Sequence, residues 1–326
     1  MLVKNRHLFI SSFEPMRKFI IRTVLLILIP VMAGTAVCEH FLRKIPNDYA
    51  YKNGWLSDNS KSVSILVMGS SHSYFGIDPV YFSGNAFNAA HVSQSIKYDH
   101  FIFSKFIDEM DSLEVLILPI SYFSIGSYGP ENGIEDWRVK YYSIYYGCNY
   151  HRFEPKYNLE IYNGLQFDKV WISILCKADH RSCNELGFGT TYKLEDRSEN
   201  WKESGATAAK RHTRAKIDST IMEKNITLVG EMVDKCVEKK TQVIILTTPT
   251  FHTYRENLNQ KQLELMEECC GYFVKHYDNV CYLNLLADER FCEDDFYDAD
   301  HLNEFGAAKL TKILQQTIDS LGVFRK

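Results

Sequence analysis

A short apolar stretch that ends abruptly at a glycine constrains the fold of this chain more than any other feature. Residues 63–68 read Val-Ser-Ile-Leu-Val-Met, and Gly69, two serines and a histidine follow directly. A run of aliphatic and β-branched residues bounded by glycine is typical of a central strand in a parallel sheet. Ligands of open α/β sheets bind at the carboxyl edge of such strands. We therefore expect Ser70, Ser71 and His72 to lie at a functional edge of a sheet.

Alternating strand and helix patterns extend this expectation to the rest of the chain. Further apolar runs predict strands near 85–90, 115–118, 243–246 and 280–285. Apolar residues at helical spacing lie between these runs, and the last predicted helix covers about 304–321. Strands that alternate with helices form parallel sheets with right-handed crossovers. We therefore expect an α/β domain built as a three-layer sandwich, with helices on both faces of a five-stranded parallel sheet.

A second motif, near the C-terminus, supplies the other groups of a candidate catalytic site. Residues 298–303 read Asp-Ala-Asp-His-Leu-Asn, just before the last predicted helix. A serine hydroxyl needs a base within hydrogen-bond reach, and that base needs an orienting partner. We therefore predict Ser71 as the nucleophile, His301 as the base and Asp298 as the acid. Taken singly, Ser71 would also fit a turn and Asp298 would fit a helix N-cap, but their combination favours the catalytic interpretation.

Together the two motifs resemble those of the SGNH (GDSL-like) hydrolase superfamily. That family carries its nucleophile in a Gly-Asp-Ser block after the first strand and its acid and base in an Asp-x-x-His block near the C-terminus. Here Ser71 aligns with the nucleophile, and Ser70 replaces the aspartate. Residues 69–79 are similar to membrane-anchored SGNH-like proteins of bacterial envelopes, including relatives of polysaccharide O-acetyltransferases. The resemblance covers roughly residues 60–320. It implies serine ester chemistry on envelope carbohydrate, with no metal or organic cofactor.

The resemblance also implies an oxyanion hole, which must present donors to the negative charge of the tetrahedral intermediate. The family uses the N–H of the nucleophile, a glycine after the second strand and an asparagine after the third. Here residues 88–90 read Asn-Ala-Ala and residues 119–121 read Pro-Ile-Ser, so the asparagine is missing. The candidates are therefore Ser71, Ala90 and Ser121 for the oxyanion, and His72 and His252 for substrate binding. The missing asparagine leaves room for acyl transfer, or for a catalytically degenerate domain that binds glycan or protein.

Two further features, Asp300 and the basic residues at 210–216, each allow more than one interpretation. Asp300 could take the role of the acid, but it adjoins His301, so we expect its side chain to point elsewhere. Either Asp300 or Asn303 is expected to cap the last helix. Basic residues gather at 210–216. Such a cluster is usually a solvated loop, and contact with an anionic glycan is the alternative.

The N-terminus departs in composition from the rest of the chain. Basic residues precede an apolar run that reaches the ~20 residues of a membrane span when residues 19–38 are counted together. Positive charge ahead of the run predicts a cytoplasmic tail over 1–22, a transmembrane anchor over 19–38 and a polar connector over 39–60. A cleaved signal segment is the alternative. Both interpretations place the following domain outside the cytoplasm, and the anchor makes the membrane a partner.

The remaining length accommodates one large domain with an insertion. The chain has 326 residues, of which 45% are apolar and 24% charged, and we assign residues 61–322 to one SGNH-like domain. A net charge of −4 gives no reason to expect nucleic-acid binding. Residues 122–240 form a helical insertion far longer than an ordinary crossover, with one helix expected at about 158–176. This insertion is either a cap over the active-site edge or a peripheral decoration.

Overall fold

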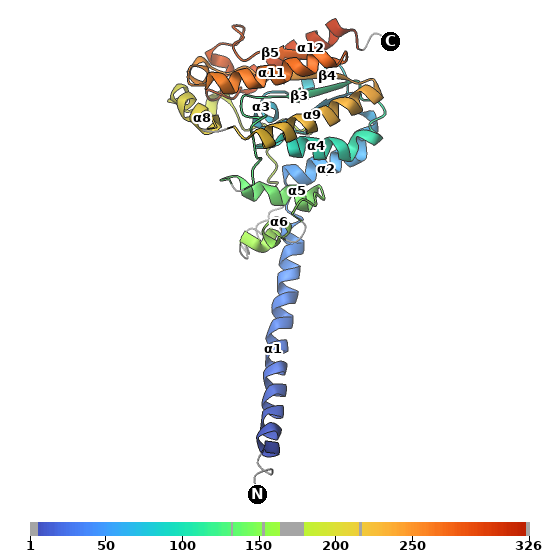
Figure 1. Ribbon diagram of the computed structural model, residues 1–326, viewed down its shortest axis with the longest axis vertical. Helices are drawn as coiled ribbons and strands as arrows, with labels where there is room; N and C mark the ends of the chain where they lie inside the picture. The colour runs from blue at the N-terminus through green and yellow to red at the C-terminus, as the bar shows by residue number, and fades with distance from the viewer. Residues whose placement is uncertain (1–5, 132, 152–153, 164–178, 215–216, 324–326) are drawn as a thin grey trace.

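A long N-terminal helix leads to an α/β domain in the computed structural model (Figure 1). The structure describes residues 6–131, 133–151, 154–163, 179–214 and 217–323. The strands are β1 (Ile65–Val67), β2 (Ala86–Asn88), β3 (Val115–Pro119), β4 (Gln242–Thr247) and β5 (Val280–Asn284). They form one five-stranded sheet in the order β2-β1-β3-β4-β5, and every neighbouring pair is parallel. The sheet predicted from the apolar runs is therefore confirmed.

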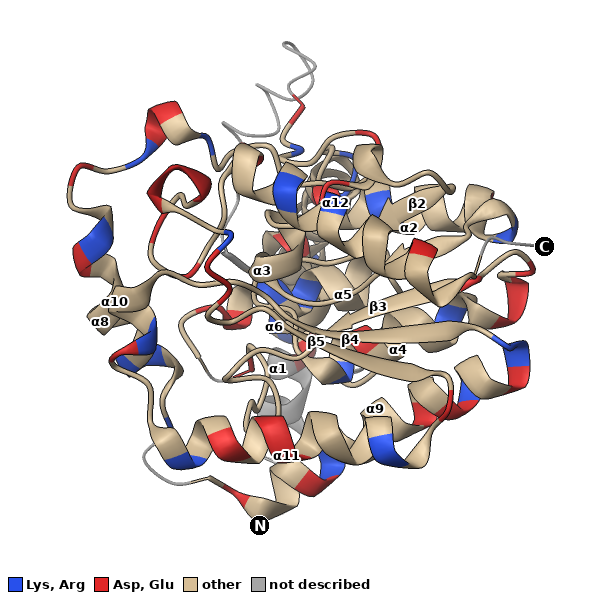
Figure 2. Ribbon diagram, turned by 90° about the horizontal axis from the view of Figure 1, so that it is seen from above, with Lys and Arg blue, Asp and Glu red and all other residues tan. Residues whose placement is uncertain are grey.

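Helices cover both faces of the sheet, which makes a three-layer sandwich (Figure 2). Successive residues of a strand point to opposite faces. Leu66 of β1 accordingly packs into one core, and its neighbours Ile65 and Val67 pack into the other. The first core contains α4 (Ile96–Phe106), α9 (Ser219–Lys239) and α11 (Gln260–His276), and the second contains α8 (Ser204–His212), α10 (His252–Arg255) and α12 (Glu304–Leu321).

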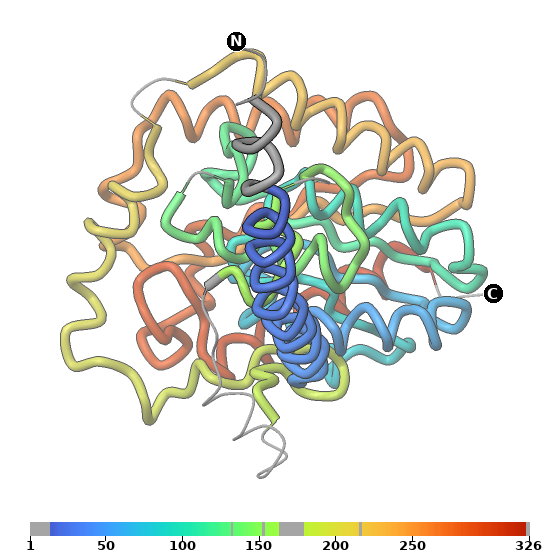
Figure 3. Tube along the Cα trace, turned by 90° about the horizontal axis from the view of Figure 1, so that it is seen from below, coloured from blue at the N-terminus to red at the C-terminus, as the bar shows by residue number. Residues whose placement is uncertain are grey.

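Helix α1 (Arg6–Leu42) extends away from the domain, and Figure 3 shows it beneath the domain when viewed from below. Its part Glu14–Leu42 is 29 residues long and apolar enough to cross a membrane, and none of its most apolar window is buried. At about 1.5 Å per residue, such a helix is longer than the ~30 Å hydrocarbon core of a bilayer. These properties fit an anchor over 19–38, and they also fit a signal segment.

The segment 39–60 differs from the polar connector that its composition predicted. Helix α1 continues to Leu42, and helix α2 (Asp48–Asn59) follows almost at once. Helix α2 buries Lys52 and Leu56 completely against the domain. Its asparagine, glycine and aspartate residues suggested a loop, but its buried residues share one helical face and find partners far away in the chain. The folded domain therefore begins near residue 48 rather than residue 61.

Two sets of contacts tie this segment to distant parts of the chain. The Lys52 ammonium donates a hydrogen bond to the Ala90 carbonyl oxygen at 2.5 Å, and burial lowers the pKa of Lys52 to about 8. The Glu39 carboxylate accepts hydrogen bonds from the N–H groups of Glu160 and Ile161, at 3.2 and 3.0 Å. The end of α1 is thus attached directly to the domain.

The chain between β3 and β4 contains the region predicted as an insertion over 122–240. Its described helices are α5 (Val139–Tyr145), α6 (Pro155–Asn158), α8 and α9. Helix α9 packs against the sheet as an ordinary crossover helix does, so the unusual part ends before it. Most of the helix predicted at 158–176 lies outside the described residues. Its described beginning holds the end of α6 and a 3₁₀ turn at Glu160–Asn163.

Candidate active site

A glycine turn at the carboxyl end of β1 presents Ser71. Gly69 has a φ of +113°, and a Cβ at this position would lie 2.7 Å from the Ser73 hydroxyl oxygen. Glycine adopts this backbone conformation without the steric cost that other residues incur. Helix α3 (Ser71–Tyr74) begins directly afterwards. As the first residue of this helix, Ser71 has a backbone N–H with no partner inside it.

Buried polar side chains hold the turn in place, and the sequence patterns gave no sign of them. The Asp99 carboxylate, which is 2% exposed, accepts hydrogen bonds from the Gly69 N–H at 2.8 Å and from the Gln94 amide at 2.7 Å. Burial raises the pKa of Asp99 to about 7, although both hydrogen bonds oppose this shift. The Asn88 side chain donates to the Ser73 carbonyl oxygen at 2.8 Å and thereby ties α3 to the end of β2.

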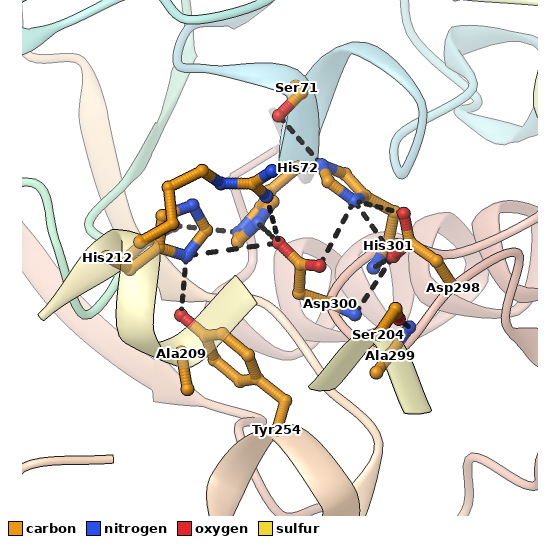
Figure 4. Close-up of polar contacts among 12 residues, drawn as sticks. Ser71, His72, Ser204, Ala209, His212, Tyr254, Asp298, Ala299, Asp300 and His301 are labelled. Carbon is orange, nitrogen blue, oxygen red and sulfur yellow. Dashed lines mark hydrogen bonds and ion pairs between the residues drawn. The ribbon is translucent and has the colours of Figure 1, made fainter. Parts of the chain in front are cut away.

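The structure brings the three predicted catalytic residues together (Figure 4). The His301 Nε2 lies 2.8 Å from the Ser71 Oγ. The His301 Nδ1 lies 3.0 and 3.1 Å from the two carboxylate oxygens of Asp298. Asp298 also accepts the backbone N–H groups of Asp300 and His301, which closes the turn around its carboxylate. Asn303 caps α12, which is one of the two predicted alternatives.

Asp300 is placed differently from the expectation that its side chain would point elsewhere. It is 2% exposed, and its Oδ1 lies 3.6 Å from the Nδ1 of His301. Its Oδ2 lies 3.4 Å from the Nε2 of His72 and 3.9 Å from the Nδ1 of His212 (Figure 4). Because the turn folds back onto Asp298, the two carboxylates converge on one imidazole. Sequence reasoning also missed His212, which comes from α8.

Burial and charge give the three histidines different properties. Burial lowers the pKa of His301, but the carboxylates of Asp298 and Asp300 more than offset it and raise the pKa to about 9. Burial lowers the pKa of His72 and lowers the pKa of His212 to about 3, despite the opposing effect of Asp300. Burial would raise the pKa of Asp300, but the neighbouring histidines hold it well below its usual range. The site therefore contains one imidazole with a raised pKa and two with lowered pKa values.

A pocket lies over Ser71 and His301, and the two predicted substrate-binding histidines do not line it. His72 is buried, and its Nδ1 lies 3.1 Å from the Ser121 Oγ and 3.3 Å from the Thr248 Oγ1. His252 begins α10 on the surface, where its exposed side chain contacts Glu256 at 3.0 Å. His72 follows the nucleophile within a helix that turns it into the core, and His252 pairs with a residue one helical turn further along.

Two of the three predicted oxyanion donors are already engaged. The Ala90 N–H donates to the Asn88 side-chain oxygen at 3.0 Å. The Ser121 N–H donates to the Ser124 Oγ at 2.9 Å, and the Ser121 Oγ lies 3.1 Å from the His72 Nδ1. Ser71 therefore offers the one N–H of the predicted set that these contacts leave open. Ser93, which has a φ of +58° and lines the same pocket, is a further feature that the sequence did not indicate.

A pocket of about 470 Å³ lies over Ser71 and His301. We call the side formed by Ser71 and His301 the catalytic wall. We call the part of the lining that residues between β3 and β4 contribute the crossover wall. The crossover wall includes Phe123, Arg138, Tyr192, Arg211, His212 and Arg214. Described parts of 122–240 thus border the pocket.

Three buried residues in this region have side chains of types that bind metals. One ligand atom from each of His72, Asp300 and His301 lies within 4.8 Å of the others. Both ring nitrogens of His301, however, already contact Ser71 and Asp298. The Arg211 guanidinium also lies 3.9 Å from Asp300. A metal ion bound here would have to displace the contacts of His301 and would lie near a positively charged guanidinium. These three residues are therefore better suited to hydrogen bonding with one another than to holding a metal ion.

The fold and these contacts define an α/β protein with a hydrogen-bonded serine, histidine and aspartate at the carboxyl edge of its sheet. No protein-family model matches the chain, and no curated protein matches it. A solved structure described as a candidate acylhydrolase from Bacteroides fragilis is 11% identical, with a TM-score of 0.40, covering 82% of this chain and 95% of that one. A GDSL-like lipase from Bacteroides thetaiotaomicron is also 11% identical, with a TM-score of 0.40, covering 84% of this chain and 99% of that one. Likenesses this low establish no activity for the present chain.

Proposed function

We propose that this protein is a membrane-tethered serine ester hydrolase or a related O-acyltransferase of the SGNH type. The observation that carries the proposal is the hydrogen-bonded series from the Ser71 Oγ through His301 to Asp298. A serine bonded to an oriented histidine is the arrangement that nucleophilic acyl transfer requires. The sequence resemblance of residues 69–79 supports an acylated carbohydrate of the cell envelope as the substrate.

The proposed reaction has two halves. In the first, the Ser71 Oγ attacks the carbonyl carbon of the ester while its proton passes to the Nε2 of His301. The bond to the alcohol then breaks, and His301 returns the proton to the departing oxygen, which leaves an acyl group on Ser71. In the second half, water or an acceptor hydroxyl attacks this acyl group and gives its proton to His301. The proton then passes to the Oγ as Ser71 is released.

Other groups support both halves of this reaction. Asp298 holds the proton on Nδ1 and stabilises the imidazolium that forms in each half. The open N–H of Ser71 is the donor available to the oxyanion of the tetrahedral intermediate. In this scheme the acceptor alone distinguishes hydrolysis from acyl transfer, because both use the same acyl-serine.

We further propose that residues 19–38 anchor the protein, with the N-terminus in the cytoplasm and the domain outside. Basic residues ahead of the apolar run support this orientation. Because Glu39 is bonded to Glu160 and Ile161, the domain would stay close to the bilayer. A reporter that is active only outside the cytoplasm, fused after residue 47, tests the orientation. An expressed but inactive reporter would contradict it, and release of the protein by alkaline carbonate would favour a cleaved signal segment.

The second candidate function is a catalytically degenerate domain that binds envelope glycan or a partner protein. The observation that favours it is that the N–H groups of Ala90 and Ser121 already have acceptors. Such a domain would keep the fold and the pocket but would not turn over an ester.

Labelling with a serine-reactive fluorophosphonate separates the two candidates. For the enzyme we expect stoichiometric labelling of the full-length protein in detergent, and loss of labelling in both Ser71→Ala and His301→Ala. Ser320→Ala, at the far end of α12, serves as a matched control and should label normally. A wild-type protein that melts cooperatively but takes up no probe would favour the binding domain.

A further inference from the structure

Three arginines line the pocket at Ser71, and all three belong to the crossover wall. Arg138 lies just before α5, whereas Arg211 lies in the last turn of α8 and Arg214 two residues after its end. Among the described residues that line the pocket, Glu135 is the one carboxylate. The crossover wall therefore carries more positive than negative charge.

Arg138 forms an ion pair with Glu135 and thereby neutralises the one carboxylate among the described lining residues. Its guanidinium donates a hydrogen bond to Glu135 and lies 4.3 Å from the ring centre of Trp137. The Arg138 side chain is 18% exposed and the Glu135 side chain 35% exposed. Arg138 is thus neutralised and held by its own neighbours in the chain. The unbalanced positive charge of the pocket belongs to the other two arginines.

Arg211 is accessible and weakly paired. Its side chain is 57% exposed, and its closest carboxylate within the described chain is that of Asp300, at 3.9 Å. This distance exceeds that of a hydrogen bond. Asp300 already lies beside three histidines, so it does not bind the guanidinium closely. The N–H groups of Arg211 are therefore available to a molecule in the pocket.

Arg214 has an unmet hydrogen-bond requirement. Its Nε is buried and has no hydrogen-bond partner among the described residues, and none of the described carboxylates forms an ion pair with it. A buried donor without an acceptor costs free energy, so native proteins rarely leave one unpaired. The backbone of Arg214 is held by Gln262, whose side-chain oxygen accepts its N–H at 2.9 Å. Arg214 therefore brings to the pocket lining a guanidinium whose Nε has no acceptor among the described residues, and such a group is suited to an anionic ligand.

We infer that Arg211 and Arg214 form an anion subsite beside Ser71, and that the ester substrate carries a carboxylate or phosphate group that binds there. Guanidinium groups bind both anions through paired N–H donors. This inference rests on the proposed function and names its substrate class, an acylated carbohydrate that contains uronic acid or phosphate. It also separates two parts of the basic segment 210–216, because Lys210 lies outside the pocket whereas Arg211 and Arg214 line it.

Binding to the full-length Ser71→Ala variant in detergent tests the subsite without requiring turnover. The probes are an oligogalacturonide, a phosphorylated oligosaccharide and a neutral oligosaccharide of equal length, each titrated by calorimetry. We expect at least one anionic probe to bind more tightly than the neutral one. Added Arg211→Gln or Arg214→Gln should weaken that binding about tenfold, since each removes a charge-assisted contact. The preferred anionic probe identifies the anion as carboxylate or phosphate.

Matched variants decide the outcome. Lys210→Gln removes the same charge one residue before Arg211 but outside the pocket, so it should leave affinity unchanged. Arg214→Lys keeps the charge and loses the paired donors, so its affinity should be intermediate, and it replaces Arg214→Gln if that variant does not fold. Equal affinity for all three probes, or an equal loss in Lys210→Gln, would overturn the subsite.

The two proposals fail in different ways. Anion binding without fluorophosphonate labelling would refute the ester chemistry and leave the subsite standing. Normal labelling together with unchanged anion preference in both arginine variants would refute the subsite and leave the chemistry standing.

Discussion

The catalytic wall and the crossover wall of the pocket are built on different principles. On the catalytic wall, Ser71 and His301 come from tight turns next to regular elements, and His301 is bonded on both sides. The crossover wall comes from the long connection between β3 and β4, and its Arg211, at the end of α8, is 57% exposed with no close carboxylate among the described residues. A paired, buried group suits chemistry, whereas an unpaired accessible one suits ligand selection. Substitutions on the first wall should therefore affect every substrate, and those on the second should change the preference among substrates.

Removing the nucleophile should produce the largest effect. Ser71→Ala should lower the turnover of a chromogenic acetyl ester by about 10⁴-fold or more, because no acyl-serine can form. The loss should be equal for neutral and anionic esters, as expected of the catalytic wall. Steady-state kinetics on both esters measures it, and an unchanged melting temperature shows that the fold survives. Retained turnover in a folded variant would exclude Ser71 as the nucleophile.

Replacing each of the two carboxylates at His301 should separate orientation from charge. Asp298→Asn should lower the maximal rate by about 10²-fold or more, because Asp298 bonds directly to Nδ1. It should also move the pH profile to lower pH, because Asp298 raises the pKa of His301. Asp300→Asn removes a charge that raises the pKa of His301, so it should move the pH profile to lower pH with a smaller loss of rate. An equal loss of maximal rate in the two variants would show that both carboxylates act in the same way.

The wild-type pH profile supplies the reference for this comparison. The pKa of His301 is raised to about 9, and the base must be neutral to accept the serine proton. The value of kcat/KM should therefore rise about tenfold per unit between about pH 6 and 8 and level off near 9. Because the folded pKa lies above the ordinary 6.5, the contribution of His301 to stability is complete below that pH and is lost as pH rises through about 9. Melting curves over the same range separate the two effects.

A substitution in the glycine turn should damage the catalytic wall through the backbone. Gly69→Ala places a Cβ 2.7 Å from the Ser73 Oγ at a φ of +113°. We expect a loss of roughly 1–3 kcal/mol in the free energy of unfolding. Displacement of the adjacent Ser71 should also lower the rate. Thermal unfolding and ester turnover, measured together, test this, and an unaltered variant in both would mean that the turn relaxes freely.

The sequence predicted the catalytic wall far better than the crossover wall, because the two depend on contacts of different range. Central parallel strands are buried on both faces, so β1 and β3 appear as continuous apolar runs. Asp298 and His301 belong to one turn, and a motif of that length can be recognised. Even on this wall, the bond between Asp99 and Gly69 spans 30 residues, and nothing near Asp99 in the chain marks that partner.

Long-range packing also explains the features that composition misrepresented. Arg211 and Arg214 appear in the sequence as part of a solvated basic loop, and the pocket becomes visible only when α8 lies against Asp300. Helix α2 appears as a polar connector, but Trp55 stacks on Phe87 of β2 with ring centres 3.8 Å apart. In each case the residue that makes the important contact is too distant in the sequence for a local pattern to include it.

The smallest expected effect comes from Gly54, a glycine that belongs to neither wall. Gly54→Ala is the control against which the destabilisation in Gly69→Ala is measured. Gly54 lies inside α2, and a Cβ at this position would have no atom within 4 Å. Alanine is the better helix former, so Gly54→Ala should stabilise the protein by about 0.5–1 kcal/mol. This gain corresponds to a rise of roughly 1–4 °C in melting temperature. Ester turnover should stay unchanged, because α2 contributes no side chain to the pocket at Ser71. An unstructured connector over 39–60 would instead leave the melting temperature where it was, so the same measurement tests whether the folded domain begins at α2.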